Sequence, residues 1–423
     1  MDIKDIRIGI IGLGYVGLPL ACLFAKRYRV DGLEINQERV NNLLRAHDET
    51  GEVCANTLVD RMEGNLHLTT HPEDLRDCNV YIVCVSTPVD EENNPDLTPL
   101  RMASATVGEL LKKDDVVIYE SSVFPGCTEQ ICVPMLTGRS GLTFNADYYV
   151  GYSPERINPG DKEHTVENIT KIVSGSTPET LNFVEKLYNS VLTNGTCRAS
   201  SIRVAEAAKV VENTQRDVNI ALMNELCSVF RAMGISTTEV LDCASTKWNF
   251  LNVRPGLVGG HCIGVDPYYL IHGAWAYNVY PHLIMEARVI NENMAHFVSG
   301  VLTKCMMDRR VHVVDSRILI LGFSFKANCP DTRNTKVEDV YSCLRRVTDH
   351  VSVYDPIVNQ DEVARRYRIQ LLNELDSHQG EFDAIILCVA HKEFLNIQLR
   401  PLLTAHGILF DAMNVLPDAD YYL

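Results

Sequence analysis

The sequence predicts an α/β protein in which two doubly wound parallel-sheet domains are joined by a helical central domain. Short, apolar, β-branched runs alternate with helical patterns near both ends of the chain, and two long helical patterns fill its middle. At 423 residues the chain is also too long for one ordinary core. We expect the boundaries at residues 1–198, 199–310 and 311–423.

Charge and composition exclude several classes of protein. The net charge of −16 argues against sequence-independent binding to nucleic acid, which needs a basic face. The first residues lack the pattern of a signal peptide, and no apolar run is long enough to span a bilayer. The fourteen cysteines show no CxxC pair and no Cys/His spacing typical of zinc. We therefore expect a cytoplasmic protein with reduced thiols and no metal.

The first element is a buried strand over 7–11 that runs into Gly12-Leu13-Gly14-Tyr15-Val16-Gly17 and then a helix over 18–26. A strand, a GxGxxG turn and a helix form the context that the dinucleotide fingerprint requires. A second strand over 29–33 ends at Glu34, whose carboxylate would accept hydrogen bonds from a ribose and repel a 2′-phosphate. The alternative is a fortuitous turn beside a surface glutamate. We predict a Rossmann-like domain that binds NAD.

Three further strands of this domain run into polar residues. The strand over 79–85 leads to Thr87, and the strand over 116–119 leads to Ser122. These hydroxyls could line the nicotinamide side or only cap turns, because ligands of such sheets bind at the carboxyl ends of the strands. After a strand over 148–152, Glu155 and Arg156 stand on a loop bracketed by prolines. This pair could place an acid or base, or form a surface salt bridge.

A long helix is predicted from the caps Ser200 and Ser201 to Arg231, before Gly234. Lys209, Asn213 and Arg216 follow at i, i+4 and i+7, so they share one face of that helix. Such a stripe is either functional or the solvated side of an amphipathic helix. A second long helix, predicted over 277–309, suggests a connector and a dimer interface.

Between these helices stands Gly259-Gly260-His261-Cys262-Ile263-Gly264-Val265-Asp266-Pro267. Cysteine thiolates are strong nucleophiles, and glycines allow a ligand close approach. A lone cysteine is usually a small buried hydrophobe, so these residues alone leave both readings of Cys262 open. The α/β pattern restarts after Ser316, but its first turn lacks GxGxxG and offers Lys326 and Arg333. Such charges suit a diphosphate, so this domain is predicted to bind a nucleotide that is not a dinucleotide.

Together these motifs resemble the UDP-glucose/GDP-mannose dehydrogenase family over essentially the whole chain. The resemblance rests on residues 12–19, 153–156, 207–213, 259–262 and 322–326 with 331–333. Residues 153–161, 213–221 and 247–250 are most similar to members that oxidise UDP-N-acetylglucosamine or UDP-N-acetylgalactosamine at C6 for bacterial capsule and O-antigen polysaccharides.

The resemblance implies a four-electron oxidation with two NAD+, through a thiohemiacetal and a thioester on Cys262. It implies that Lys209, with Asp266 and Asn213, handles the proton of the C6 hydroxyl and stabilises the oxyanion that develops there. It also implies that Glu155 is the base for thioester hydrolysis. The NAD residues it implies are Gly12, Gly14, Tyr15, Val16, Gly17, Glu34, Arg39, Thr87, Ser122 and Arg333. The UDP-sugar residues it implies are Arg156, Ile157, Lys209, Asn213, Arg216, Asn249, Phe250, Arg254, Gly256, Phe325 and Lys326. Arg288 would reach the substrate of a neighbouring subunit in a homodimer.

Three positions depart from the family pattern. Glu34 replaces a more frequent aspartate, Ser122 replaces a threonine, and Asp411-Ala412-Met413 stands where relatives usually carry a basic residue, so a charge contact there is in doubt. UDP-N-acetylmannosamine and UDP-glucose remain alternative substrates. Other classes also compete, namely a catalytically silent nucleotide-binding protein and a two-electron hydroxyacid dehydrogenase, which would need no cysteine.

Overall fold

The computed structural model describes residues 5–155 and 163–423, and it forms two compact units. The first unit comprises Met1–Glu212 and Tyr268–Tyr280, and the second comprises Asn213–Pro267 and Pro281–Leu423. Helix α7 therefore begins in one unit and ends in the other. The division at residues 198 and 310 stays a prediction.

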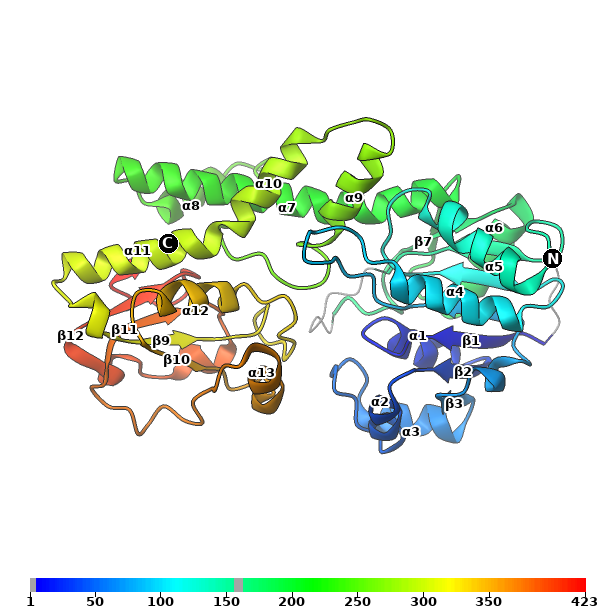
Figure 1. Cartoon of the computed structure of the whole chain (residues 1–423), viewed down its shortest axis with the longest axis horizontal. Coiled ribbons are helices and arrows are strands. Elements are labelled where there is room, and N and C mark those ends of the chain that lie inside the picture. The colour runs from blue at the N-terminus through cyan, green and yellow to red at the C-terminus, as the bar shows by residue number, and fades with distance from the viewer. Residues whose placement is uncertain (1–4, 156–162) are drawn as a thin grey trace. The chain divides into compact units, whose positions relative to one another are not determined.

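The first unit is built on an eight-stranded sheet with the order β3-β2-β1-β4-β5-β6-β7-β8 (Figure 1). All neighbours pair in parallel except β6 and β7. The elements up to α7 are β1 (Arg7–Ile11), α1 (Gly17–Phe24), β2 (Arg29–Leu33), α2 (Gln37–Leu44), α3 (Ala55–Glu63), β3 (Leu66–Thr69), η1 (Pro72–Leu75), β4 (Val80–Val83), α4 (Thr98–Leu110), β5 (Val116–Tyr119), η2 (Thr128–Cys132), α5 (Val133–Ser140), β6 (Tyr149–Tyr152), β7 (Lys171–Gly175), α6 (Pro178–Asn189) and β8 (Thr196–Arg198).

The alternation of side chains along the strands explains why helices cover both faces of this sheet. Ile8 and Ile10 point into a core shared with α1 and α6. The opposite face packs on α4, where the Tyr119 hydroxyl bonds the Ser104 hydroxyl at 2.8 Å. The order 3-2-1-4-5-6 reverses direction between β1 and β4, the point at which such sheets bind ligands.

The second unit contains a five-stranded parallel sheet with the order β10-β9-β11-β12-β13. From α7 onward the elements are α7 (Ile202–Met233), α8 (Thr237–Ser245), α9 (Asp266–Trp275), α10 (His282–Glu292), α11 (Met294–Asp308), η3 (Val313–Asp315), β9 (Arg317–Leu321), α12 (Val337–Arg345), β10 (His350–Tyr354), α13 (Gln360–Tyr367), β11 (Phe382–Leu387), η4 (Lys392–Asn396), η5 (Arg400–Leu402), β12 (Leu403–Asp411) and β13 (Tyr421–Tyr422).

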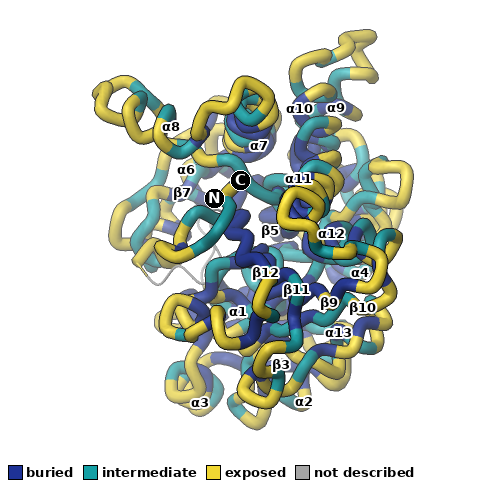
Figure 2. The backbone as a smooth tube through the Cα atoms, turned by 90° about the vertical axis from the view of Figure 1, so that its left-hand side faces the viewer, coloured by how far each residue is buried: buried dark blue, intermediate teal, exposed yellow. Residues whose placement is uncertain are grey.

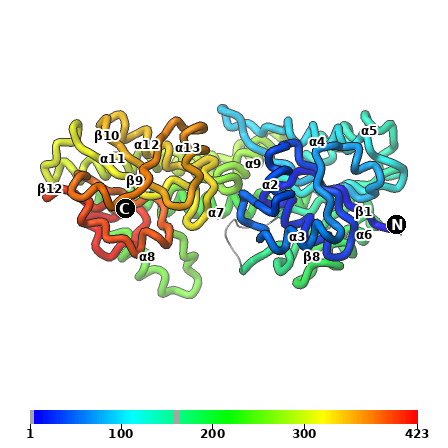
Figure 3. Tube along the Cα trace, turned by 90° about the horizontal axis from the view of Figure 1, so that it is seen from below, coloured from blue at the N-terminus to red at the C-terminus, as the bar shows by residue number. Residues whose placement is uncertain are grey.

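Both faces of this sheet are buried as well. Ile318 and Ile320 belong to a core with α11, α12 and α13, while Leu319 and Leu321 pack on η4 and η5. Figure 2 shows the exposed residues concentrated in loops and on the outer sides of helices. The C-terminus lies within the second unit (Figure 3), where β13 pairs with the end of β12. No helix of the described ranges is long and apolar enough to cross a bilayer.

The long helix α7 begins and ends where the sequence predicts. The Ser201 hydroxyl accepts a hydrogen bond from the Val204 backbone N–H, and Gly234 ends the helix with φ +71°. The continuous helix predicted over 277–309 is wrong, since α10 starts only at His282 and a break at Asn293 separates it from α11. The Asn293 side chain donates to the Val289 carbonyl, which competes with the backbone ladder at that turn.

Candidate active site

The glycine-rich turn after β1 has a backbone that only glycine can follow at two of its positions. Gly12 has φ +90°, and a Cβ there would lie 3.1 Å from the Cys84 carbonyl oxygen at the end of β4. A Cβ on Gly17 would lie 1.8 Å from the Gly12 carbonyl oxygen. The turn is thus closed against β4 at the switch point of the sheet, as the dinucleotide fingerprint predicts.

The turn leaves room for a ligand at its centre. A Cβ on Gly14 would meet nothing within 4 Å, and α1 begins just beyond, with Val16 as its N-cap. The helix N-terminus favours an anion. This open backbone beside a helix N-terminus fits a pyrophosphate, with Tyr15 and Val16 at the position predicted for NAD.

Glu34 and Arg39 both bond the backbone of Leu13 in the turn. One Glu34 carboxylate oxygen accepts from the Leu13 N–H at 3.0 Å, and the other accepts from the Asn36 N–H at 3.1 Å. The buried Arg39 guanidinium donates to the Leu13 carbonyl at 2.9 Å and pairs with Asp48 at 2.8 Å. Arg39 therefore stabilises the backbone of the turn, a structural role that the sequence alone did not indicate.

The ends of β4 and β5 carry the two predicted hydroxyl residues. Thr87 and Ser122 are both half-buried in loops past these strands. The Ser121 hydroxyl donates to the Val85 carbonyl at 2.6 Å and ties the two loops together. Tyr269 donates to the Pro88 carbonyl at 3.0 Å. The loops at the predicted nicotinamide side are therefore fixed by hydrogen bonds at the carboxyl ends of β4 and β5.

Glu155 is buried, and its two polar groups meet two different lysines. Its backbone carbonyl accepts from Lys209 at 2.7 Å, and its carboxylate pairs with Lys171 at 2.9 Å. This ion pair with Lys171 lies in the interior and is not the surface salt bridge considered for Glu155 and Arg156. Arg156 and Ile157 lie outside the described residues.

Asn213 stands one turn beyond Lys209 on α7 and is fully buried. Its side-chain amide donates to the Asp266 carboxylate at 2.6 Å. The Asp266 backbone N–H in turn donates to the Cys262 carbonyl at 2.8 Å. Asp266 and Cys262, the predicted nucleophile, therefore belong to one hydrogen-bonded turn that leads into α9.

The loop that carries Cys262 is held by the segment before α12. Gly260 and Asn334 bond each other twice, through the Gly260 N–H at 3.2 Å and the Asn334 side chain at 3.3 Å. His261 bonds Asp331 at 2.7 Å. A Cβ on Gly260 would lie 2.7 Å from the Phe325 ring, so the predicted substrate residue Phe325 lies directly against the loop.

Cys262 is less buried than many of the other cysteines. Cys262 is half-buried, whereas burial raises the pKa of Cys22 and of Cys78 to about 12. Such thiols are poor nucleophiles at neutral pH. Cys54 is exposed, as are Cys197 and Cys243, and a hydrogen bond with Thr57 lowers the pKa of Cys54.

Of the remaining predicted substrate residues of the central segment, Arg216 lies on α7 and the others follow α8. Arg254 is exposed and pairs with Asp242 at 2.7 Å. Gly256 is fixed by Asn224, whose side-chain amide both accepts from its N–H at 2.8 Å and donates to its carbonyl at 3.1 Å. The others differ in exposure, with Arg216 and Asn249 exposed and Phe250 half-buried.

Arg288 is buried in its own chain. Its guanidinium bonds Asp217 at 2.5 Å and also pairs with Glu292. Asn291 donates to the same Asp217 carboxylate at 2.8 Å. Asp217, one turn past Asn213 on α7, was not singled out from the sequence, although its i+4 spacing was visible there. The expectation that Arg288 serves a neighbouring subunit stays a prediction.

The second sheet repeats the turn of the first with a different acid. Gly322 has φ +86°, and the carboxylate of Asp355, which follows β10, accepts from the Phe323 N–H at 2.6 Å. Asp355 also accepts from Ser324, Ile357, Val358 and His391. Burial would raise the pKa of Asp355, but the His391 hydrogen bond and charge outweigh it and lower that pKa.

The predicted cations of this unit are half-buried near that turn. Lys326 follows it directly, and the Arg333 guanidinium pairs with Asp331 at 2.7 Å. The buried Asp411 carboxylate accepts from the backbone of Met413, Val415 and Leu416. That departure from the family pattern therefore stabilises a turn.

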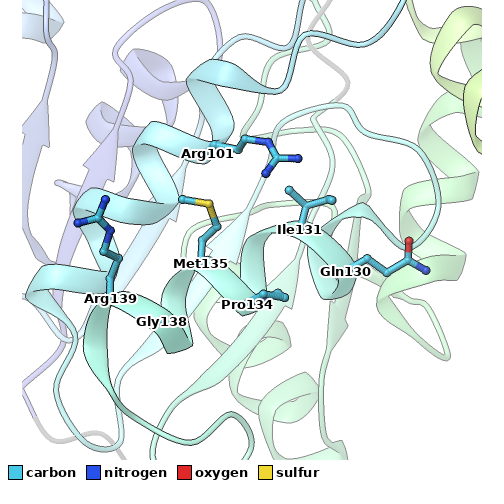
Figure 4. A pocket seen from close by; sticks show the side chains of 7 residues that line it. All are labelled: Arg101, Gln130, Ile131, Pro134, Met135, Gly138 and Arg139. Atoms are coloured by element: carbon cyan, nitrogen blue, oxygen red, sulfur yellow. The ribbon is translucent and has the colours of Figure 1, made fainter.

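A separate pocket of about 410 Å³ lies between α4 and α5. Arg101 on α4 and Arg139 on α5 line it with Met135 (Figure 4). None of the predicted site residues lines this pocket. Within residues 5–155 and 163–423, no cluster of three or more His, Cys, Asp or Glu side chains could hold a metal ion.

Comparison with known proteins relates all three parts of the chain to one family. Residues 6–192 match the NAD binding domain of the UDP-glucose/GDP-mannose dehydrogenase family, 203–293 match its central domain and 319–418 its UDP binding domain. The UDP-N-acetyl-D-glucosamine 6-dehydrogenase of Pseudomonas aeruginosa is 51% identical over 98% of both chains. The protein of that name from Salmonella typhi is 48% identical over 98% of this chain and 97% of its own.

Solved structures agree with the fold. A UDP-D-ManNAc dehydrogenase from Pyrococcus horikoshii superposes with a TM-score of 0.89 at 31% identity, covering 99% of this chain and 98% of its own. The glycine turn, the open backbone at Gly14 and the acid Glu34 fit the cofactor of such enzymes, which is NAD. The chain belongs to the UDP-glucose/GDP-mannose dehydrogenase family of NAD-dependent enzymes.

Proposed function

We propose that this protein oxidises the C6 hydroxyl of UDP-N-acetylglucosamine to the carboxylate, with two NAD+ per sugar. The observation that carries the proposal is the link from Asn213 through the Asp266 carboxylate to the Cys262 loop, with Lys209 one turn earlier on the same helix. A nucleotide-binding module would need neither a cysteine nor a buried amide–carboxylate pair in its loop. The two relatives named UDP-N-acetyl-D-glucosamine 6-dehydrogenase support this choice of sugar.

In the first oxidation, the Asp266 carboxylate accepts the proton of the C6 hydroxyl while the hydride leaves C6. Bound NAD+ supplies the hydride acceptor for this step and for the second. Asn213 holds the Asp266 carboxylate, and the Lys209 ammonium, which has three N–H donors, gives one of them to the Glu155 carbonyl. The positive charge of the Lys209 ammonium stabilises the developing oxyanion.

In the second oxidation, the Cys262 thiolate adds to C6 of the aldehyde, and Asp266 returns its proton to the aldehyde oxygen. The thiohemiacetal then loses its carbon-bound hydrogen as a hydride and its hydroxyl proton to Asp266, which gives a thioester. Water adds to the thioester carbon and passes one proton to Glu155, the C–S bond breaks, and Cys262 leaves as a thiolate. The carboxylic acid loses the second proton to solvent, and the sugar is released as a carboxylate.

The finer parts of the proposal concern substrate and setting. UDP-N-acetylgalactosamine is the second candidate, and the likeness to a UDP-D-ManNAc dehydrogenase keeps UDP-N-acetylmannosamine in the comparison set with UDP-glucose. We place the enzyme in the cytoplasm as a homodimer that supplies a uronic acid for capsule or O-antigen polysaccharide. A relative named Protein CapL from Staphylococcus aureus, 46% identical, fits that setting.

The test measures NADH released per sugar consumed, with a panel of the four UDP-sugars and GDP-mannose. Two NADH per UDP-N-acetylglucosamine and a uronic acid product are expected. One NADH per sugar would instead indicate a two-electron dehydrogenase, and no NADH with any sugar would indicate a silent binding protein.

Two cysteine variants make the test specific. Cys262→Ser should form aldehyde but lose the second oxidation, because a hydroxyl is a far weaker nucleophile than a thiolate. Cys54→Ser removes an exposed thiol with a lowered pKa and should keep full activity. Full activity of Cys262→Ser would refute the covalent mechanism.

A further inference from the structure

Lys171 is completely buried in the first unit, and its ammonium sits among four oxygen atoms. Two are carboxylate oxygens, from Glu120 at 2.6 Å and Glu155 at 2.9 Å. The other two are the carbonyls of Pro154 at 3.1 Å and Ser153 at 3.4 Å. An ammonium has three N–H donors, so this one is fully used. A buried charge with this much hydrogen bonding is held in one place.

The antiparallel strand β7 is what brings Lys171 to this point. Tyr152, the last residue of β6, pairs with Ser174, so β7 starts beyond the carboxyl end of β6. If β7 were parallel to β6, its first residue would lie at the amino ends of the other strands. The side chain of Lys171, the first residue of β7, instead lies at their carboxyl ends, where the ligand-binding loops of such sheets begin.

Lys171 joins two loops that the proposed function uses. Glu120 directly precedes Ser121 and Ser122 after β5, while Glu155 follows β6 and is the proposed base. Tyr188 on α6 also donates to the Glu120 carboxylate and supports it from the other side.

We propose that Lys171 is a positioning residue that fixes Ser153, Pro154 and Glu155 and holds its ammonium against the Glu155 carboxylate for thioester hydrolysis. This assignment rests on the proposed role of Glu155 as the base that takes a proton from water. The lysine touches neither substrate nor cofactor in this role. It acts only through the carboxylate and the two carbonyls that it holds.

The charges of the cluster agree with this role. Burial lowers the pKa of Lys171, but the two carboxylates outweigh it and raise that pKa, so the lysine stays charged. Burial raises the pKa of Glu120 to about 7 despite the lowering effect of Lys171. Glu155 thus shares its cation with a glutamate that is only partly ionised near neutral pH. The titratable groups that act on Glu155 include Cys84 after β4, Glu120 after β5, Lys171 on β7 and Lys209 on α7, while Tyr188 on α6 contacts Glu120.

The test needs a variant that folds without the lysine. Lys171→Met alone leaves two buried carboxylates without a cation and should therefore destabilise the first unit. The double variant Lys171→Met with Glu120→Gln removes one anion together with the cation. One lysine and two glutamates carry a formal charge of −1, and so does the single remaining glutamate. Glu120→Gln alone is the matched control, and thermal unfolding reports whether each protein folds.

The readout separates hydrolysis from the oxidations. With UDP-N-acetylglucosamine, the double variant should give a rapid burst of two NADH per chain, followed by steady turnover about 100-fold slower than in Glu120→Gln, the low end of the range for loss of a general base because the base is misplaced rather than removed. Intact-protein mass spectrometry should then detect the sugar thioester on Cys262. The acid limb of the pH profile should move to higher pH, because removal of a neighbouring cation favours the protonated carboxyl. Lys171→Arg, which keeps the cation, should keep the acid limb in place.

Three results would overturn the assignment, and they can be told apart. A double variant with the steady rate and pH profile of Glu120→Gln would refute the role of Lys171 while leaving the proposed function intact. Absence of NADH from the wild-type protein, or full hydrolysis by Glu155→Gln, would refute the role of Glu155 and this assignment with it.

Discussion

Replacing Gly17 with alanine should destabilise the first unit, because the new methyl group would overlap the backbone of the same turn. Its Cβ would lie 1.8 Å from the Gly12 carbonyl oxygen and 3.1 Å from the Cys84 side chain. The Gly12 carbonyl cannot move aside easily, since the Gly12 N–H is bonded to the Leu33 carbonyl at 2.9 Å. Relief requires a shift of α1 away from β1.

Overpacking of this kind costs about 3 kcal/mol or more when the clash is with backbone. For a unit of this size, ~1 kcal/mol corresponds to ~2–4 °C in Tm, so a loss of roughly 6–12 °C is expected. The assay is thermal unfolding of the protein without cofactor. A Gly17→Ala protein that melts with the wild type would refute the packing argument.

Gly14→Ala is the matched control from the same motif. Its Cβ would meet nothing within 4 Å and its φ is not positive, so stability should change by less than about 0.5 kcal/mol. The added methyl would nevertheless stand where a pyrophosphate approaches the backbone. Calorimetry should therefore show weaker NAD binding. Unchanged binding would mean that the cofactor does not lie over Gly14.

Further predictions concern buried carboxylates of the second unit. Burial would raise the pKa of Asp331, but hydrogen bonds from His261 and Arg333 outweigh it and lower that pKa. Such a group contributes stability above its unfolded pKa of about 4 and loses it as pH falls through the folded value. Asp331→Asn should accordingly lose less stability than the wild type between pH 5 and acid, as measured by urea unfolding; an equally steep loss would contradict this. Asn213→Ala should cost about 1–3 kcal/mol by leaving the buried Asp266 carboxylate without that donor, whereas an unchanged urea midpoint would show that another donor replaces it.

Several strands of both sheets could be predicted because they are short, mostly apolar runs, whereas β3, β7, β8 and β13 were not predicted. Arg7–Ile11, Arg29–Leu33, Val116–Tyr119 and Arg317–Leu321 occur with the predicted bounds. The prediction failed at Asn293, where a side-chain hydrogen bond to Val289 interrupts an otherwise helical pattern. Hydrophobic periodicity does not register such local competition.

The site was predictable where local motifs carry it and not where it depends on distant pairing. The glycine turn and Glu34 meet as their spacing requires. Lys171 gave no signal, because its burial depends on an antiparallel strand pairing that no local pattern encodes. For the same reason Arg39 was expected to bind the cofactor, although its guanidinium is also part of the backbone support of the turn.

The matching turns of the two sheets show how one protein can recognise two different nucleotides with one backbone design. The Asp355 carboxylate already receives at least five donors, more than the roughly four lone-pair sites that a carboxylate offers. No acceptor site on Asp355 is left for ribose hydroxyls, the contact predicted for Glu34 in the first sheet. The prediction for Glu34 therefore implies that cofactor and substrate are told apart by whether the acid after the second strand of each sheet can still accept a hydrogen bond.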